Sequence, residues 1–244
     1  MTSTLRVEPR FCGPPGTGNG GYVAGRVASV LEGAVEVTLR APTPLDCDLS
    51  LTRTEQGASL HSPEGVLLAE ATSLTSLEVP LPPPLSFARA QQASARYVGF
   101  QHHPYPACFV CGPLRGAALA PGLALFPGAV ELAEDAEQRV AAPFVPAPEL
   151  CDEHGLLRAE YVWAALDCPS WFGYASFLER PPPTLLGRLA LSIARRPGTR
   201  ERCVVQGFAL GREGRRIFCG AALFGADETC IAYSRATWVE LKSA

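Results

Sequence analysis

Two segments, far apart in the chain, carry residue types suited to acid–base chemistry. Asp167 stands in a strongly apolar stretch, and burial there should raise the pKa of its carboxyl group and make it a better general base. The apolar neighbours are Val162, Trp163, Ala165, Leu166, Trp171 and Phe172. The second segment is the Gly- and Pro-rich run Cys12–Gly21, which ends in Asn19, Gly20 and Gly21 directly before an apolar stretch.

A helix that begins at this glycine pair would offer unpaired N–H groups and the positive end of its dipole to a developing oxyanion. Glycines also let a substrate carbonyl approach the backbone closely. We therefore predict Asn19, Gly20, Gly21 and Asp167 as catalytic residues. Two alternatives stay open. Asp167 precedes Pro169 and could be the N-cap of a second short helix, and the Gly-rich run could be only a flexible loop or a helix entry.

The cysteines raise the question of a metal site. Cys108-x2-Cys111 has metal-ligand spacing, and Cys151-x2-His154 is the candidate second pair. Because the chain has a full apolar core without metal, we expect no metal and no cofactor. Cys108 and Cys111 are then packed thiols in a loop that lines the substrate channel. Cys168 would be a nucleophile only if a base lay beside it.

Three aromatic residues, Tyr22, Trp163 and Trp171, are assigned to substrate binding, with packing in the core as the alternative for the tryptophans.

Composition limits the class of protein. The 244 residues include 47% hydrophobic and only 18% charged residues, which allows one large core or two smaller ones. A net charge of −3 argues against nucleic acid as a partner. The sequence has neither a signal peptide nor a long enough apolar run for a membrane helix, so we expect a cytoplasmic protein with free thiols.

Hydrophobic periodicity gives the same order of elements in both halves of the chain. The first half predicts a buried helix over Tyr22–Leu31 and strands over Ala34–Pro42, Asp46–Thr54, Ala58–His61 and Gly65–Val79. In the second half, an irregular lead over Gly122–Leu157 precedes a helix over Ala159–Tyr174. Four strands follow, over Leu185–Arg195, Cys203–Leu210, Arg216–Phe224 and Cys230–Leu241, with hairpin turns at Gly211–Gly214 and Gly225–Glu228.

Each half therefore predicts one buried helix covered by an antiparallel sheet, an α+β architecture. This order resembles the hotdog fold, and its duplication resembles the double-hotdog acyl-CoA thioesterases. "NGGYVAGRVA" (Asn19–Ala28) is similar to the "HGG" helix start of phenylacetyl-CoA-type thioesterases, with Asn19 in place of the histidine. "EYVWAALDCPSW" and "HPYPACFVCGP" resemble a group of uncharacterised bacterial hotdog proteins.

The resemblance implies two fused hotdog domains, over residues 1–95 and 122–244, with a CxxC-containing linker over 96–121. It also implies sites that pair a glycine N–H from one half with a carboxylate from the other. The first half has Gly20 and Gly21, but Ala28 stands seven residues on where the acid should be. The second half has Asp167, but Ala159 and Glu160 replace the glycines. One composite site and one silent site are expected.

The function implied is hydrolysis of an acyl-CoA thioester. A non-catalytic acyl or CoA binder stays open, because loss of one site could have extended to both. An enoyl-CoA hydratase or dehydratase would pair a histidine with an aspartate, and the first half offers only His61, on a predicted strand. Assembly into a homodimer is left undecided.

Overall fold

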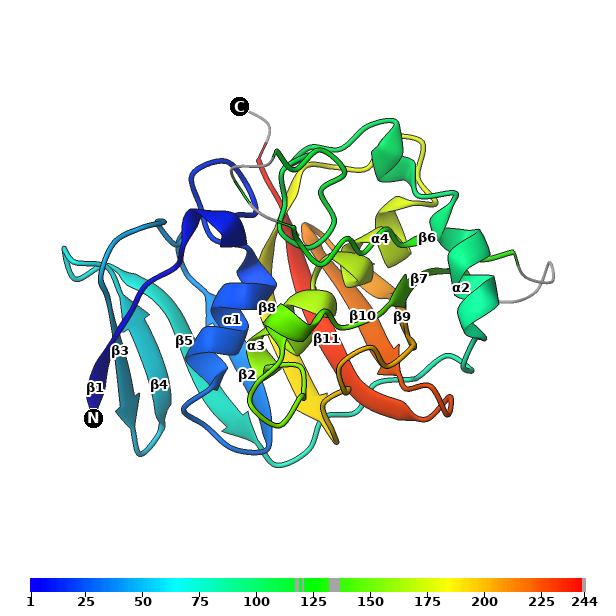
Figure 1. Cartoon of the computed structure of the whole chain (residues 1–244). Helices are drawn as coiled ribbons and strands as arrows, with labels where there is room; N and C mark the ends of the chain where they lie inside the picture. Colours follow the sequence, from blue (N-terminus) through cyan, green and yellow to red (C-terminus); the bar gives the residue numbers. More distant parts are fainter. Residues whose placement is uncertain (117–118, 120, 132–136, 243–244) are drawn as a thin grey trace.

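The computed structural model describes residues 1–116, 119, 121–131 and 137–242, and its strands form one continuous antiparallel sheet (Figure 1). The strands of the first half are β1 (Thr2–Leu5), β2 (Ala34–Leu39), β3 (Leu49–Thr54), β4 (Gly57–His61) and β5 (Leu67–Leu74). Those of the second half are β6 (Gly128–Ala129), β7 (Arg139–Phe144), β8 (Thr184–Ile193), β9 (Cys203–Glu213), β10 (Arg216–Phe224) and β11 (Cys230–Glu240).

The α-helices are short. They are α1 (Gly20–Ala28), α2 (Phe87–Ser94), α3 (Ala159–Ala165) and α4 (Cys168–Ala175). Single 3-10 turns, η1 (Pro9–Phe11), η2 (Val98–Phe100) and η4 (Pro148–Leu150), lie in the connections. Within the described residues, no helix has the length and apolar character needed to cross a membrane.

The order of strands is the same from the centre of the sheet outward in both directions. The two halves of the chain meet where β2 pairs with β8, with Val37 opposite Leu189. From there the order is β2-β5-β4-β3-β1 on one side and β8-β11-β10-β9-β7 on the other, with β6 added beyond β7. The strand that follows the buried helix of each half is therefore central. Of the next three strands, the first lies farthest out and the last pairs with the central strand.

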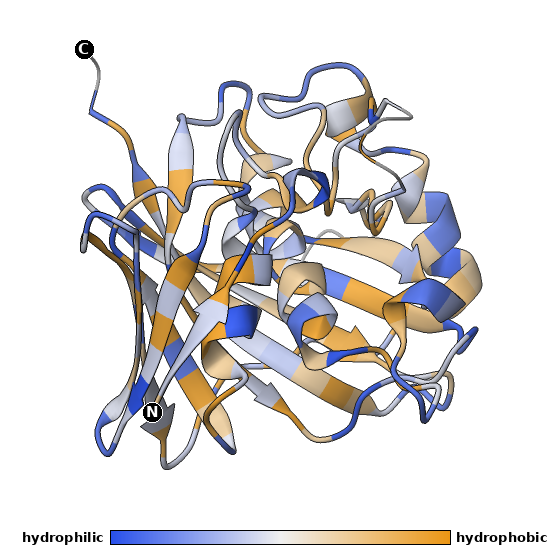
Figure 2. Ribbon diagram, turned by 60° about the vertical axis from the view of Figure 1, so that its left-hand side comes forward, coloured by the Kyte–Doolittle hydropathy of each residue, from blue (hydrophilic) through white to orange (hydrophobic). Residues whose placement is uncertain are grey.

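Helices α1 and α3 lie side by side in front of the sheet (Figure 1), and their side chains join the main apolar core. Hydrophobic and hydrophilic residues alternate along many of the strands, and hydrophilic residues also occur in the loops (Figure 2). Helix α4 packs on β9, where a Cβ on Gly207 would lie 1.8 Å from the carbonyl oxygen of Pro169. Only glycine permits this close approach of helix and strand backbones.

Glycines also set the spacing between α1 and α3. Gly21 and Gly25, four residues apart, lie on one face of α1. A Cβ on Gly21 would lie 2.9 Å from the carbonyl oxygen of Trp163, and one on Gly25 would lie 2.7 Å from Cα of Glu160. The start of α1 thus lies against the end of α3, and the helices are antiparallel. This contact brings the two chain halves together at Asp167.

The sequence-based prediction of elements needs several corrections. The single helix expected over Ala159–Tyr174 is two helices, because Pro169 cannot lie in a helix interior and instead occupies the first turn of α4. The lead over Gly122–Leu157 is not wholly irregular, since it contains β6 and β7. Strand β1 and helix α2 were not predicted. The turn after β9 is at Gly214–Arg215, because the strand continues to Glu213.

Parts of the predicted domains lie outside the described residues. These are residues 117, 118 and 120 of the predicted linker, and residues 132–136, 243 and 244 of the predicted C-terminal domain.

Candidate functional site

The carboxylate of Asp167 lies at the helix start of the other half of the chain. Its Oδ2 accepts hydrogen bonds from the backbone N–H of Gly21 and from Nδ2 of Asn19, each at 2.9 Å. Asp167 is separated from both partners by more than a hundred residues and stands between α3 and α4. Both side chains are buried, with Asn19 3% and Asp167 2% exposed. The geometry joins the glycine pair of the first half to the acid of the second half.

Asn19 both caps helix α1 and donates a hydrogen bond to Asp167. It is the N-cap of α1, because its Oδ1 accepts a hydrogen bond from the backbone N–H of Tyr22 at 2.9 Å. With the oxygen fixed in this way, the amide NH2 group points at Asp167. The capping bond therefore orients the donor that the carboxylate uses, and the helix start is held rigidly on both sides.

Burial raises the pKa of Asp167 to about 7, and the neighbouring charge of Cys108 acts in the same direction. The hydrogen bonds from Gly21 and Asn19 act in the opposite direction, because they stabilise the charged carboxylate. Among the described residues, no group forms a hydrogen bond with the second carboxyl oxygen, Oδ1, which is also shielded from solvent. The acid thus keeps one oxygen without a protein partner.

The alternative prediction for Asp167 was that it caps a second short helix. The position is as predicted, but the side chain makes no capping contact. Asp167 is the N-cap residue of α4, yet its side chain makes no capping hydrogen bond. The backbone provides the contact instead, since the carbonyl oxygen of Asp167 accepts from the N–H of Ser170 at 3.0 Å and from its hydroxyl at 2.7 Å. The carboxylate is directed across the helix pair rather than along its own helix.

Three buried thiols adjoin this acid. Sulfur atoms of Cys108, Cys111 and Cys168 lie within 4.8 Å of one another. Nδ2 of Asn19, which donates to Asp167, also lies 3.8 Å from Sγ of Cys108 and 3.9 Å from Sγ of Cys168. All nine cysteines of the chain are free. The thiol cluster and the carboxylate thus share one amide donor.

The sequence did not predict this cluster as a unit. The candidate second pair is wrong, because Cys151 donates to the carbonyl oxygen of Ala147 and His154 is exposed at the surface. The third thiol is Cys168, which was weighed only as a nucleophile. No spacing rule links Cys168 to Cys108 across 60 residues. Only the contact between the linker loop and the start of α4 brings them together.

The pKa values of the three thiols are shifted in different directions. Hydrogen bonds from the thiols of Cys111 and Cys168, followed by the backbone N–H groups of Cys111 and Val110, hold the pKa of the Cys108 thiol below its ordinary value. Burial raises the pKa of Cys111, and the hydrogen bond with Cys108 raises that of Cys168. Hydrogen bonding thus favours the thiolate form at Cys108, whereas the pKa values of Cys111 and Cys168 are shifted in the opposite direction.

The remaining residues assigned from sequence make packing contacts. Gly20 begins α1, and a Cβ there would meet side chains of Leu39 and Leu186 rather than Asp167. Tyr22 is buried and stacks on Phe11 with ring centroids 4.0 Å apart.

Trp163 is buried in α3, with its Cβ 2.8 Å from where a Cβ on Gly25 would lie. Trp171 is half-buried and has ring contacts with Trp238 and Tyr174.

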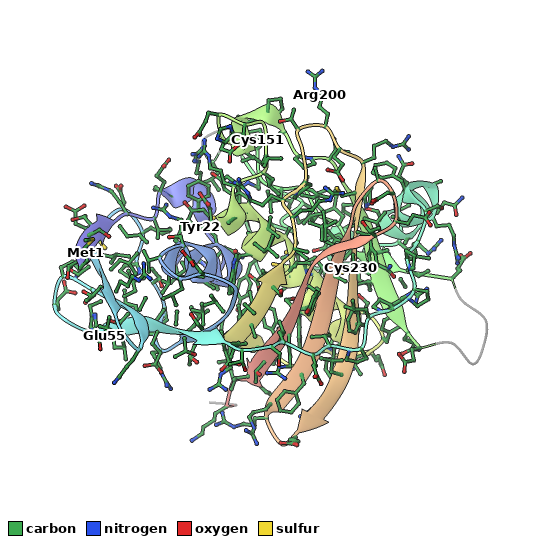
Figure 3. The ribbon with its side chains drawn as sticks, turned by 90° about the horizontal axis from the view of Figure 1, so that it is seen from below. Met1, Tyr22, Glu55, Cys151, Arg200 and Cys230 are labelled. Carbon is green, nitrogen blue, oxygen red and sulfur yellow. The ribbon has the colours of Figure 1, made fainter. Side chains whose placement is uncertain are left out.

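The acid is buried, and the loop that carries Cys108 lies beside it. Two surface cavities have volumes of about 790 and 760 Å³. The first lies at the edge of the sheet, where Figure 3 marks Met1 and Glu55, and the second lies between the segment that follows β8 and the start of α3. Neither cavity is lined by Asn19, Gly21 or Asp167. A ligand would therefore reach the carboxylate only after neighbouring residues had moved.

The opposite end of the helix pair has no equivalent set. Glu160, at the start of α3, lies against Gly25, and the residue at the expected acid position is Ala28, which is buried. An alanine side chain offers neither a proton acceptor nor a nucleophile. The helix pair thus holds one buried carboxylate at a glycine N–H, and Ala28 stands where the second acid is expected.

No family model and no curated protein matches the sequence. Solved structures match over the whole chain. The tesB protein MAP1729c of Mycobacterium avium subs. paratuberculosis is 10% identical, with a TM-score of 0.64 over 99% of this chain and 93% of that one. A conserved protein of unknown function with a hot dog fold from Alicyclobacillus acidocaldarius is 14% identical, with a TM-score of 0.60 over 100% and 94%.

A third protein, from Thermobifida fusca and provisionally named a thioesterase II, is 10% identical, with a TM-score of 0.62 over 99% of this chain and 92% of that one. At identities this low, the structural matches establish the fold only, and the chemistry must be argued from the residues of the site. The large antiparallel sheet, the few helices packed on it and the full-length matches together show that this chain has the α+β hotdog fold.

Proposed function

We propose that the protein hydrolyses an acyl-CoA thioester at a single composite site formed by Asn19, Gly21 and Asp167. The observation that carries this proposal is the convergence of the Gly21 N–H and the Asn19 amide on the carboxylate of Asp167. A donor at a helix start, a polar side chain and a buried acid meet there within hydrogen-bond distance. These are the groups that acyl transfer to water requires.

The chemistry follows from which group the N–H of Gly21 binds. The thioester oxygen would replace Oδ2 of Asp167 as the acceptor of this N–H, and the displaced carboxylate would face a water molecule. Asp167 takes a proton from the water molecule while the water oxygen attacks the carbonyl carbon. The N–H of Gly21 stabilises the resulting oxyanion. The C–S bond then breaks, and the proton passes to the leaving sulfur. The products are a carboxylic acid and free CoA.

A duplicated architecture supports a single composite site. We propose that residues 1–95 and 122–244 are two fused hotdog domains and that residues 96–121 link them. The repeated strand order from β2 and from β8 outward, and the antiparallel pairing of α1 with α3, agree with this division. Ala28 and Glu160 would then mark the silent counterpart. Gly20 would contribute by starting the helix, and the predicted substrate contacts are Tyr22, Trp163, Trp171, Cys108 and Cys111.

The experiment is an assay of purified protein against acyl-CoAs of increasing chain length, with a dye that detects released CoA thiol. The dye must be calibrated against enzyme alone, because the chain carries nine thiols of its own. Turnover of at least one member of the panel is expected. If the folded protein released no CoA from any acyl-CoA, the proposed function would be rejected.

A second candidate is a non-catalytic acyl or CoA binder. The observation in its favour is the closed site, in which the carboxylate itself occupies the Gly21 donor and both Asn19 and Asp167 are almost wholly buried. A binder would gain thermal stability from a non-hydrolysable acyl-CoA analogue without releasing CoA from the corresponding thioester. An enzyme would show both stabilisation and product. The same samples, followed by the absorbance of a conjugated enoyl-CoA, test the hydratase alternative.

A further inference from the structure

We propose that the thiols of Cys108, Cys111 and Cys168 form a binding site for a zinc ion. All three residues are buried, and their sulfur atoms lie within 4.8 Å of one another. Zinc held tetrahedrally by thiolates at about 2.3 Å requires its sulfur ligands to be about 3.8 Å apart. Sγ of Cys108 and Sγ of Cys168 are 3.8 Å apart. This pair therefore already stands at the spacing that the ion needs, and the third sulfur atom lies within 4.8 Å of both.

The loop that carries the first two thiols has the form of a ligand turn. Backbone N–H groups of Val110 and Cys111 donate to Sγ of Cys108, and the N–H of Gly112 donates to the carbonyl oxygen of Cys108 at 3.0 Å. A Cβ on Gly112 would lie 2.5 Å from the backbone nitrogen of Cys108 and from the carbonyl oxygen of Pro106, so the turn requires glycine. N–H donors aimed at sulfur stabilise the thiolate form, which is the form that binds metal.

Two side chains also donate toward these sulfur atoms. Asn19 approaches Cys108 and Cys168 with its amide NH2 group. His103 receives the N–H of Tyr105 on Nδ1 at 2.9 Å, so the proton of its neutral ring is on Nε2, which lies 3.3 Å from Sγ of Cys111. His103 is thus positioned to donate to the Cys111 sulfur rather than to act as a fourth ligand. Polar groups that surround a metal site from outside act in this way.

The chemistry of the cluster suits a cation. Three buried sulfur atoms lie together, and a divalent cation would stabilise their thiolate forms, because each thiol loses its proton when it binds the ion. Thiolate ligands select zinc over magnesium or calcium, which prefer oxygen. Three protein ligands leave one coordination position for water or another small ligand.

The consequence for the fold is a link between segments that are distant in sequence. Cys108 and Cys111 belong to the loop beside the acid, and Cys168 is the first residue of α4, directly after Asp167. The ion would fix that loop against the start of α4. Metal binding would replace the substrate-lining role predicted for Cys108 and Cys111 from sequence. The proposed zinc site does not depend on whether the protein hydrolyses a thioester.

The test measures metal directly. The protein is purified under reducing, anaerobic conditions, its metal content is determined by mass spectrometry, and the chelated protein is titrated with Co²⁺. We expect zinc in the purified protein at about one ion per chain. We also expect that Co²⁺ gives the thiolate-to-cobalt charge-transfer band and the intense d–d bands of a tetrahedral site. Fully reduced, folded protein that binds neither ion would overturn the proposal.

Variants separate ligands from neighbours. Cys168→Ser should weaken zinc binding by more than about 100-fold, which exceeds the about 10–100-fold cost of losing an outer partner. His103→Gln should stay within that smaller range and retain the tetrahedral cobalt spectrum. The matched control is Cys151→Ser, a buried thiol in the loop before α3, which is expected to bind zinc as the wild type does (Figure 3). If Cys168→Ser does not fold, Cys111→Ser replaces it. Unchanged zinc affinity in a folded ligand variant would overturn the assignment.

Discussion

Replacement of Gly21 by alanine should force α1 away from α3 and break the contact with Asp167. The new Cβ would lie 2.4 Å from Cβ of Asp167 and 2.9 Å from the carbonyl oxygen of Trp163. Carbon atoms in contact are ordinarily at least about 3.5 Å apart, so the helices must separate by about 1 Å. The 2.9 Å bond from the Gly21 N–H to Asp167 would then exceed the length of a hydrogen bond.

The magnitude follows from two separable costs. Overpacking of a well-filled core costs about 1–3 kcal/mol. Loss of a hydrogen bond to a buried charged group adds about 1.5–3 kcal/mol. Gly25→Ala is the matched control, because its Cβ would lie 2.7 Å from Cα of Glu160 in the same helix contact without reaching Asp167. It should show the overpacking cost alone.

Urea denaturation of the wild type and both alanine variants measures the difference. Gly198→Ala serves as a neutral reference, because the nearest atom to its added Cβ is 3.9 Å away. We expect the free energy of unfolding to fall most for Gly21→Ala, less for Gly25→Ala and little for Gly198→Ala. Equal stability of Gly21→Ala and the wild type, or a larger loss in Gly25→Ala, would refute the close approach of Gly21 to the acid.

Three further predictions concern stability. Asn19→Ala removes a helix cap and an amide donor, and it should cost about 1–3 kcal/mol in urea denaturation, whereas an unchanged midpoint would contradict the capping role. Ser170→Ala leaves the indole N–H of Trp238, now 3.0 Å from the serine hydroxyl, without this buried acceptor. It should cost about 1–3 kcal/mol and shift the tryptophan fluorescence, and a silent spectrum would count against it. The hydrogen bonds from Arg195 lower the pKa of Glu201, so their stabilisation is present above the ordinary glutamate pKa and is lost as the pH falls through the lowered value. Glu201→Gln should therefore be less stable than the wild type by about 1 kcal/mol at neutral pH and equal to it in acid, and a constant difference across this range would be evidence against the pairing.

Local sequence rules were sufficient for most of the sheet. Alternation and turn residues locate strands β2–β5 and β8–β11 to within a few residues, because each has a buried and a less buried face or ends at a clear turn. Strand β7 escaped prediction because five of its six residues are buried and it contains Pro143, so it shows no alternation. Helix α2 was not predicted because its segment has low hydropathy and therefore shows no clear apolar pattern.

The site was only partly within reach of sequence reasoning. Gly21 and Asp167 could be paired, because the order of elements repeats and the acid of one half complements the glycine turn of the other. The thiol cluster could not, since Cys168 is joined to Cys108 and Cys111 by tertiary contact and not by spacing. The dual role of Asn19, as a helix cap and as a donor to Asp167, also depends on a rotamer that no sequence pattern specifies.

The most direct measurement of the hydrolase proposal compares two acid-to-amide variants on the best acyl-CoA of the panel. Asp167→Asn keeps an oxygen that can accept from Gly21 and Asn19 but loses the base, and kcat/KM should fall by about 10²–10⁴-fold. Glu160→Gln removes a carboxylate that stands at the glycine position of the silent counterpart, and it should leave kcat/KM unaltered. A folded Asp167→Asn variant that releases CoA as fast as the wild type would contradict the composite site.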